Sequence, residues 1–257
     1  MVRPLGDGLL WELTPEPAWT GADAAVLLLP GVGGTTGDFA LWTCHLAPVF
    51  RVLTVRYPGR DRTADPPPGP AGLAAGLAHR VVRHVPEPLL ILGHSMGAVI
   101  GYETACRLAR HGRPALALHV CAAFSPPEYA AFDLNTRTMD DDALTDLART
   151  LAIPLPREER AQQRHDALRA VRADLALIDA YDCGPRPRPL EYPVTVWSAR
   201  DDTVVPAASA HRWQSAARHP LTHHTLPVAH HCLTDRQAIE PITRALRAGA
   251  RSGVGWA

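Results

Sequence analysis

The hydrophobic positions of the chain form short continuous runs of strand length, at residues 24–29, 52–57, 88–93, 115–122, 194–198 and 221–226. Continuous runs are typical of strands that are covered on both faces. Between them, apolar residues recur with helical spacing at residues 71–84, 96–111, 207–218 and 236–248. Strands that alternate with helices predict an α/β fold, with a mainly parallel sheet flanked by helices. Residues 8–13 fit an additional antiparallel edge strand.

One long interval breaks this alternation. Between residues 126 and 192 no run has strand character, and two helical patterns occupy residues 140–151 and 163–181. Open α/β sheets bind ligands at the carboxyl ends of their strands, and an insertion at this point of the chain would cover those ends. We expect a single domain over residues 1–257, with residues 126–192 inserted as a helical lid. A helical insertion without function is the alternative.

The motif Gly-His-Ser-Met-Gly at residues 93–97 lies where the third apolar run meets a helix. A strand, a sharp turn and a helix with a serine at the apex form a nucleophile elbow, which exposes the serine hydroxyl. The turn leaves no room for side chains on either flank of Ser95, which explains the glycines. The motif alone is weak, because average residue usage produces it by chance in about one chain in ten. Its position favours acyl transfer through a serine ester.

A nucleophilic serine needs a histidine as its base and an acid that orients the histidine. In the α/β-hydrolase fold these follow in the order serine, acid, histidine, each at the end of a strand. Asp201 and Asp202 follow the run at 194–198, and His230 and His231 follow the run at 221–226. The residues themselves do not decide between the members of either pair.

The oxyanion of such a reaction needs two N–H donors. Met96 is expected to supply one, because its N–H lies at a helix N-terminus, where the dipole also favours negative charge. The glycine-rich loop at residues 30–34 is expected to supply the other through Val32. This loop lacks the signatures of nucleotide binding, and the histidines of the last third lack metal-ligand spacing. No cofactor and no metal are therefore expected.

Composition adds limits on partners and location. The 257 residues carry 26 basic and 26 acidic side chains, a balance that gives no general attraction to nucleic acid or to a membrane. The five cysteines are scattered without CxxC spacing, which predicts free thiols in a reducing compartment. No apolar run approaches the ~18 residues of a membrane span, and the first residues lack the apolar region of a signal peptide. We expect a cytoplasmic protein.

Several segments together resemble one known family, the type II thioesterases of nonribosomal peptide and polyketide biosynthesis. These are stand-alone α/β-hydrolases that remove acyl groups from the phosphopantetheine arm of carrier proteins. The resemblance extends from about residue 11 to residue 248. The elbow is common to many hydrolases, whereas the Pro-Gly-Arg segment at residues 58–60 and the Arg-Ala-Asp segment at residues 172–174 are more specific to this family. The segments that carry it are PGVGG at 30–34 with Phe39 and Trp42, VRYPGR at 55–60 with Pro66 and Pro67, GHSMGA at 93–98 with Glu103, and LR at 168–169 with RAD at 172–174 and Tyr181.

The resemblance implies a choice within each pair. The family acid lies in a G-x-x-D pattern, which corresponds to Asp202, and the family histidine ends a G-G-H pattern, which corresponds to His230. Val32 takes the position of an oxyanion-hole alanine. Gly31 replaces a common histidine, and neither glycine before His230 is present. These differences from the family pattern are expected in the walls of the pocket, so they affect the expected substrate preference more than the expected mechanism.

The resemblance also implies a function. The chain would hydrolyse acyl or aminoacyl thioesters, with Ser95, Asp202 and His230 as a triad and with Val32 and Met96 as the oxyanion hole. The partner, an acyl or peptidyl carrier protein, would bring the phosphopantetheine, so the enzyme itself needs no cofactor. We expect a monomer that binds neither nucleic acid nor membrane. A product-releasing or cyclising acyltransferase, and a small-ester hydrolase with the same triad, remain alternatives.

Overall fold

The computed structural model describes residues 2–14, 23–47, 49–59, 69–157 and 160–252. Within these residues, eight strands form one sheet in the order β1-β2-β4-β3-β5-β6-β7-β8. β1 pairs antiparallel with β2 and β2 with β4, and the other neighbouring pairs are parallel. The strands are β1 (Arg3–Leu5), β2 (Leu10–Glu12), β3 (Ala24–Leu29), β4 (Phe50–Val55), β5 (Leu89–His94), β6 (Ala117–Cys121), β7 (Val194–Ala199) and β8 (Thr222–Leu226).

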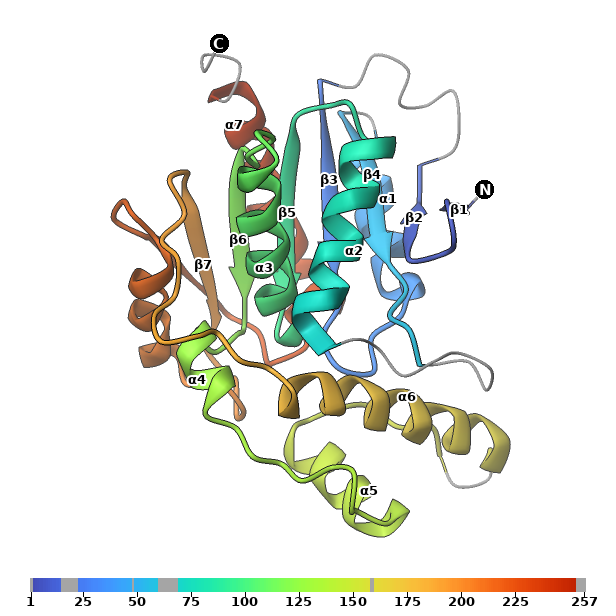
Figure 1. Ribbon diagram of the computed structural model, residues 1–257. Helices are drawn as coiled ribbons and strands as arrows, with labels where there is room; N and C mark the ends of the chain where they lie inside the picture. The colour runs from blue at the N-terminus through green and yellow to red at the C-terminus, as the bar shows by residue number, and fades with distance from the viewer. Residues whose placement is uncertain (1, 15–22, 48, 60–68, 158–159, 253–257) are drawn as a thin grey trace.

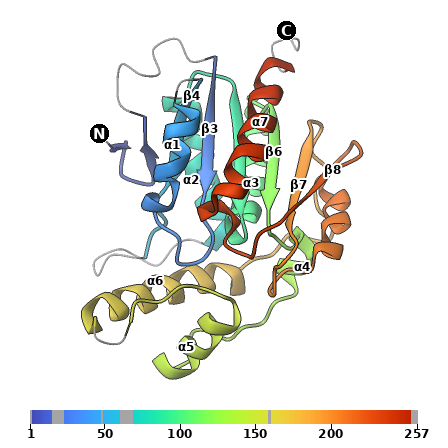
Figure 2. The same ribbon diagram turned by 180° about the vertical axis from the view of Figure 1, so that it is seen from behind.

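Helices cover both faces of this sheet. Figure 1 shows α2 and α3 on one face, and Figure 2 shows α1 and α7 on the other. The α-helices are α1 (Ala40–Leu46), α2 (Gly69–His84), α3 (Met96–Arg110), α4 (Pro126–Ala130), α5 (Asp141–Thr150), α6 (Ala161–Asp179) and α7 (Arg236–Ser252). Short 3-10 segments are η1 (Thr36–Phe39), η2 (Ala207–Ala216) and η3 (Cys232–Thr234).

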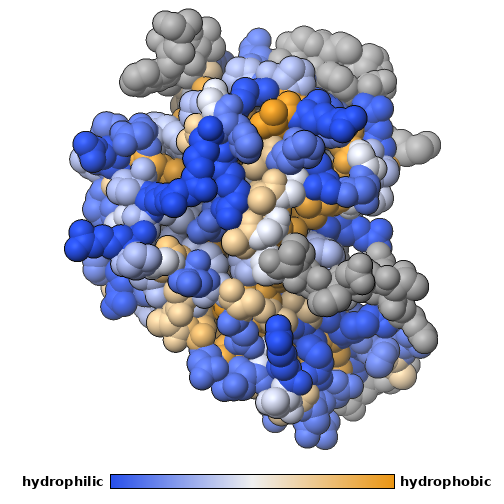
Figure 3. Space-filling view, viewed as in Figure 1, coloured by the Kyte–Doolittle hydropathy of each residue, from blue (hydrophilic) through white to orange (hydrophobic). Residues whose placement is uncertain are grey.

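The strand β3 shows why the sheet is buried on both faces. Each of its six side chains is buried, and successive side chains of a strand point to opposite faces. Its residues therefore divide between two cores, with Ala25, Leu27 and Leu29 in the core that includes α2 and α3, and Ala24, Val26 and Leu28 in the core that includes α1 and α7. The face of the molecule shown in Figure 3 is mainly hydrophilic, with small hydrophobic areas.

The observed sheet confirms the predicted α/β fold. The six predicted strands are β3 to β8, each within two residues of its predicted ends, and the predicted edge strand is β2. The predicted helix at residues 207–218 is wrong in type, because this segment forms the 3-10 helix η2. The sequence pattern missed α1 and α4, which have seven and five residues and are too short for a helical period to register.

The interval 126–192 holds α4, α5 and α6, which lie beneath the sheet in Figure 1, at the carboxyl ends of its strands. Near its end, Leu190 forms an isolated parallel bridge with Ala217, the residue that follows η2. Part of one segment that carries the family resemblance, Arg60 with Pro66 and Pro67, lies outside the described residues. No helix among the residues described could cross a membrane.

The cysteines differ from the sequence-based prediction. Cys121 at the end of β6 and Cys232 in η3 are joined as a disulfide, so the prediction of free thiols is wrong for this pair. The fold brings together two residues that are 111 positions apart in the chain, a proximity that cysteine spacing cannot show. Cys44, Cys106 and Cys183 are free.

Candidate active site

Ser95 lies at a sharp turn between β5 and α3. Its backbone has φ +50° and ψ −125°, a left-handed conformation that a side-chain-bearing residue adopts only when its surroundings enforce it. A Cβ on Gly93 would collide with the backbone of Ala98, and one on Gly97 would collide with the carbonyl oxygens of Leu29 and Pro30. The two glycines are thus required by close backbone approach, as the sequence motif predicted.

The loops after β7 and β8 bring an acid and a histidine together. His230 Nδ1 lies 2.9 Å from Asp202 Oδ2 and 3.1 Å from Asp202 Oδ1. The Asp202 carboxylate also accepts hydrogen bonds from the backbone N–H groups of Val204 and Val205, at 2.8 and 2.9 Å. The side chains of Asp202 and His230 are 0% and 6% exposed. This pair is therefore a dry carboxylate–imidazole contact of fixed orientation.

The environment keeps the Asp202 carboxylate ionised. Burial raises its pKa, but the hydrogen bond from His230, the charge of that ring and the backbone N–H groups of Val205 and Val204 outweigh burial. The net pKa of Asp202 therefore lies below its usual value. An ionised acid at this position holds a proton on His230 Nδ1 and leaves Nε2 available as a base.

The second member of each sequence pair points elsewhere. Asp201 is exposed, and its backbone N–H donates to the Val228 carbonyl. His231 Nε2 hydrogen-bonds to the carbonyl of Ala152, at the end of α5. Burial, followed by the charge of His230, lowers the pKa of His231 against the opposing effect of this hydrogen bond. His231 therefore ties the insertion to the loop after β8, while His230 faces Asp202.

The loop after β3 packs directly against the elbow. A Cβ on Gly31 would lie 2.7 Å from His94 Nδ1 and 3.2 Å from the Ser95 Cβ, so a histidine at position 31 has no room beside His94. The Gly34 N–H donates to the Gly31 carbonyl at 3.1 Å, which closes a turn over Val32. Val32 is nearly buried and lines the same cavity as Ser95.

The insertion holds this loop from the other side. The Gly33 N–H donates to Asp174 Oδ2 on α6 at 2.9 Å. Asp174 is fully buried, and Gly33 has φ +72°, a conformation that favours glycine. Asp174, in the RAD segment, therefore positions the residue next to Val32.

His94 contributes a further fixed contact. Its Nε2 lies 2.8 Å from the His230 carbonyl oxygen, and the two rings lie 5.1 Å apart. Burial, with the charge of His230, lowers the pKa of His94 to about 3. The ring is therefore neutral near pH 7 and donates its Nε2 proton, which fixes the backbone of His230.

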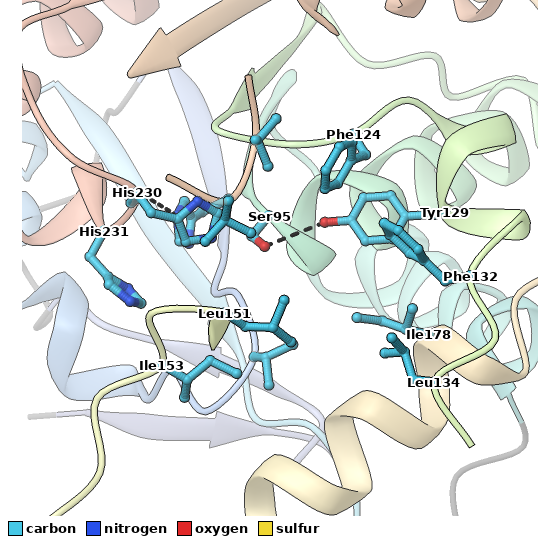
Figure 4. A pocket seen from close by; sticks show the side chains of 14 residues that line it. Ser95, Phe124, Tyr129, Phe132, Leu134, Leu151, Ile153, Ile178, His230 and His231 are labelled. Atoms are coloured by element: carbon cyan, nitrogen blue, oxygen red, sulfur yellow. Dashed lines mark hydrogen bonds between the residues drawn. The ribbon is translucent and has the colours of Figure 1, made fainter. Parts of the chain in front are cut away.

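A cavity of about 60 Å³ lies between the elbow and the insertion (Figure 4). Ser95 and His230 line it together with Tyr129, whose hydroxyl is hydrogen-bonded to Ser95 Oγ at 3.3 Å. Other walls are the side chains of Phe124, Phe132 and Ile178. The cavity is thus mainly apolar and has the Ser95 hydroxyl in its wall, an arrangement suited to an acyl chain beside a serine.

Tyr129 is the site residue that the sequence did not single out. It belongs to α4, which is too short for its periodicity to be visible. A signal was present, because Ser125 and Glu128 form a capping box around two prolines, a pattern that marks a helix start. Across the described part of the chain, no group of three or more His, Cys, Asp or Glu residues is arranged to hold a metal ion.

The sheet, the elbow and the acid–histidine pair define the class as the α/β-hydrolase fold. The family model for the thioesterase domain matches residues 24–248, and the chain belongs to the thioesterase family.

Individual relatives agree with this assignment. The chain is 31% identical over 219 residues to a probable cadicidin biosynthesis thioesterase of Streptomyces griseus, covering 83% of this chain and 59% of that protein. It is 30% identical over 247 residues to the thioesterase PikA5 of Streptomyces venezuelae, covering 91% and 84%. The structure of BorB, a type II thioesterase from the borrelidin biosynthetic cluster, is similar with a TM-score of 0.80 and 27% identity, over 95% of this chain and 98% of that one.

Proposed function

We propose that this chain is a stand-alone thioesterase that hydrolyses acyl or aminoacyl thioesters from the phosphopantetheine arm of acyl or peptidyl carrier proteins. The observation that carries the proposal is the buried contact between Asp202 and His230 at the cavity that Ser95 also lines. The similarity to PikA5 and BorB over most of their lengths supports a thioesterase of biosynthetic pathways. Release of stalled acyl groups is the role that this activity would serve.

In the first half-reaction, His230 Nε2 takes the proton of the Ser95 hydroxyl, and Ser95 Oγ forms a bond to the thioester carbonyl carbon. The oxygen of the tetrahedral intermediate accepts hydrogen bonds from the N–H groups of Val32 and Met96. Each such donor contributes about 3 kcal/mol to stabilisation of the transition state. The carbon–sulfur bond then breaks, and the pantetheine thiol leaves with the proton from His230.

In the second half-reaction, water takes the place of the thiol. His230 removes a proton from water as the oxygen of the water adds to the ester carbonyl. The bond between carbon and Ser95 Oγ breaks, and His230 returns the proton to Ser95. Asp202 stays ionised throughout and stabilises the imidazolium of His230, as its lowered pKa requires.

Residues 126–192 serve in this proposal as a lid over a single catalytic domain. The helices α4 and α6 contribute Tyr129 and Ile178 to the cavity walls, and the α5–α6 connection contributes Ile153. Apolar walls from an inserted segment fit an acyl chain and exclude water from its surroundings. The carrier protein would deliver its acyl group beneath these helices.

The remaining parts of the proposal concern partners and place. The enzyme would act in the cytoplasm as a monomer, with a carrier protein as its partner and with neither nucleic acid nor membrane. It would need no cofactor, since the carrier brings the phosphopantetheine.

Replacement of the nucleophile tests the proposed function. The variant Ser95→Ala should fold normally and lose at least about a thousandfold in kcat on acyl-loaded carrier protein, because no oxygen remains to form the acyl-enzyme. Circular dichroism and thermal unfolding provide the control for folding. Hydrolysis by Ser95→Ala at the rate of the unaltered chain would overturn the proposal. Faster hydrolysis of simple esters than of matched pantetheine thioesters would instead favour a small-ester hydrolase.

A further inference from the structure

The Tyr129 hydroxyl is held rigidly at the reacting atoms. Tyr129 is 4% exposed, and its hydroxyl lies 3.3 Å from Ser95 Oγ (Figure 4). Its ring packs edge-to-face against Phe124 and Phe132, with centroids 5.9 and 5.5 Å apart. Ser125 fixes the start of α4 through its capping box. The position of the hydroxyl is therefore set by packing as well as by its contact with Ser95.

This hydroxyl acts as a hydrogen-bond donor. Burial raises the pKa of Tyr129 far above its usual value against the opposing effect of the Ser95 hydrogen bond, so the phenol keeps its proton at every pH at which the protein works. The proposed mechanism directs the single proton of Ser95 to His230. The contact between the two hydroxyls is therefore made with the Tyr129 proton, donated to a lone pair of Ser95 Oγ.

Acylation of Ser95 removes this partner. The oxygen becomes part of an ester, and its lone pair is delocalised into the carbonyl, so it accepts hydrogen bonds poorly. A buried hydroxyl without a partner is costly. In the acyl-enzyme, Tyr129 therefore needs a new acceptor inside the cavity.

The other polar side chains of the cavity are the rings of His94, His230 and His231, and each makes one hydrogen bond to the protein. His230 Nδ1 contacts Asp202, His94 Nε2 contacts the His230 carbonyl, and His231 Nε2 contacts the Ala152 carbonyl. Among the described residues that line the cavity, the rest are apolar.

In the proposed mechanism His230 Nε2 takes the proton of the attacking water, and His94 Nδ1 faces Gly31, where a Cβ would lie 2.7 Å from it. The proposed mechanism places the ester carbonyl oxygen at the Val32 and Met96 N–H groups, so a further oxygen on the acyl group would give Tyr129 its acceptor.

We propose that Tyr129 selects acyl groups that carry an oxygen on the second or third carbon, as a hydroxyl or a keto group, over fully reduced chains of the same length. This inference rests on the proposed function, because it specifies which thioesters that site prefers. In the acyl-enzyme the second carbon is two bonds from Ser95 Oγ and the third is three bonds away. An oxygen on either lies within reach of a hydroxyl that is 3.3 Å from the same Oγ, and the small volume of the cavity, about 60 Å³, limits where it can turn.

The variant Tyr129→Phe tests the inference with matched substrates. The measurement is kcat/KM for butyryl-pantetheine and for both enantiomers of 3-hydroxybutyryl-pantetheine. Loss of the donor should lower kcat/KM for the better hydroxylated enantiomer about tenfold, because a site that binds a polar group through a buried donor loses that discrimination when the donor is removed. The value for butyryl-pantetheine should change by less than about threefold.

A second variant controls for the loss of any buried tyrosine hydroxyl. The Tyr181 hydroxyl hydrogen-bonds to Glu103 at 3.1 Å and does not line the cavity. Tyr181→Phe should leave the ratio of the two kcat/KM values unchanged.

The possible results are distinct. An equal loss on both substrates in Tyr129→Phe would overturn the inference, since it would mean that the hydroxyl only orients Ser95. An unchanged ratio with unchanged rates would overturn it as well. If the unaltered chain hydrolysed neither thioester, the proposed function itself would be wrong.

Discussion

The conformation of Ser95 is determined by the short sequence pattern around it. The flanking glycines permit a turn in which Ser95 adopts φ +50°, and the turn directs its side chain into the cavity. The sequence could predict this arrangement because the two glycines mark it. A Cβ on Gly93 would meet the backbone at the start of α3, and a Cβ on Gly97 would meet the backbone at the end of β3. Tyr129 could not be predicted in the same way, since its contact with Ser95 depends on how a five-residue helix packs.

The paired aspartates and histidines provide a test at the residue scale. Asp202→Asn should lower kcat roughly 10³- to 10⁴-fold, because an amide does not hold the His230 tautomer or stabilise its charge. Asp201→Asn should retain nearly full activity, since the Asp201 side chain is exposed. Steady-state hydrolysis of acyl-pantetheine measures both variants.

The histidines extend this test. His230→Ala should abolish turnover, whereas His231→Ala should retain the chemistry and weaken only the contact with Ala152. If Asp201 or His231 were the member whose loss abolished activity, the proposed roles would be reversed.

At the scale of elements, two of the contacts between the insertion and the core lie next to the loop after β3 and the loop after β8. Asp174 on α6 accepts the Gly33 N–H, and His231 contacts Ala152 after α5. Helical periodicity predicted α5 and α6 because ten and nineteen residues leave a clear pattern. These links could not be predicted from periodicity, since they join residues that are more than seventy positions apart.

The Asp174 contact leads to a prediction about the oxyanion hole. Asp174→Ala should free the Gly33 N–H, loosen the adjacent Val32 and lower kcat about tenfold to a hundredfold. Asp174→Asn keeps an oxygen acceptor and should lie closer to the unaltered chain. Binding of a boronic-acid analogue of the tetrahedral intermediate should weaken in parallel with kcat. A fall in thermal stability without any change in kcat or analogue affinity would show that Asp174 acts on folding alone.

At the scale of the whole molecule, one sheet places the residues of the site close together, although they come from segments that are far apart in the chain. Ser95 follows β5, Asp202 follows β7 and His230 follows β8, and all three lie at the carboxyl ends of parallel strands, where α/β folds place their sites. Strand order along the chain could therefore be used to predict that these three residues lie at one edge of the sheet. The disulfide between Cys121 and Cys232 depends on packing near those same ends and escaped prediction.

Buried histidines make the stability of the molecule depend on pH. Burial lowers the pKa of His94 to about 3 and that of His119 to about 4, from 6.5 in both cases. Between these values and pH 6.5 the unfolded chain binds more protons than the folded chain, so the free energy of unfolding falls as the pH falls. Above pH 6.5 both histidines are neutral in the folded and the unfolded chain, so they no longer change the free energy of unfolding with pH.

Denaturant unfolding at several pH values checks this expectation. His119→Gln should reduce the slope of unfolding free energy against pH between about 4 and 6.5, since one buried neutral imidazole is removed. An unchanged slope would show that His119 is not held neutral by burial.

The proposed reaction requires that a carrier-bound acyl group is transferred to Ser95. Mixtures of the chain with acyl-loaded carrier protein, quenched with acid, digested and analysed by mass spectrometry, detect this transfer. We expect an added mass equal to that of the acyl group on the peptide that contains Ser95, and no such adduct in Ser95→Ala. An adduct on another residue, with turnover preserved in Ser95→Ala, would contradict it.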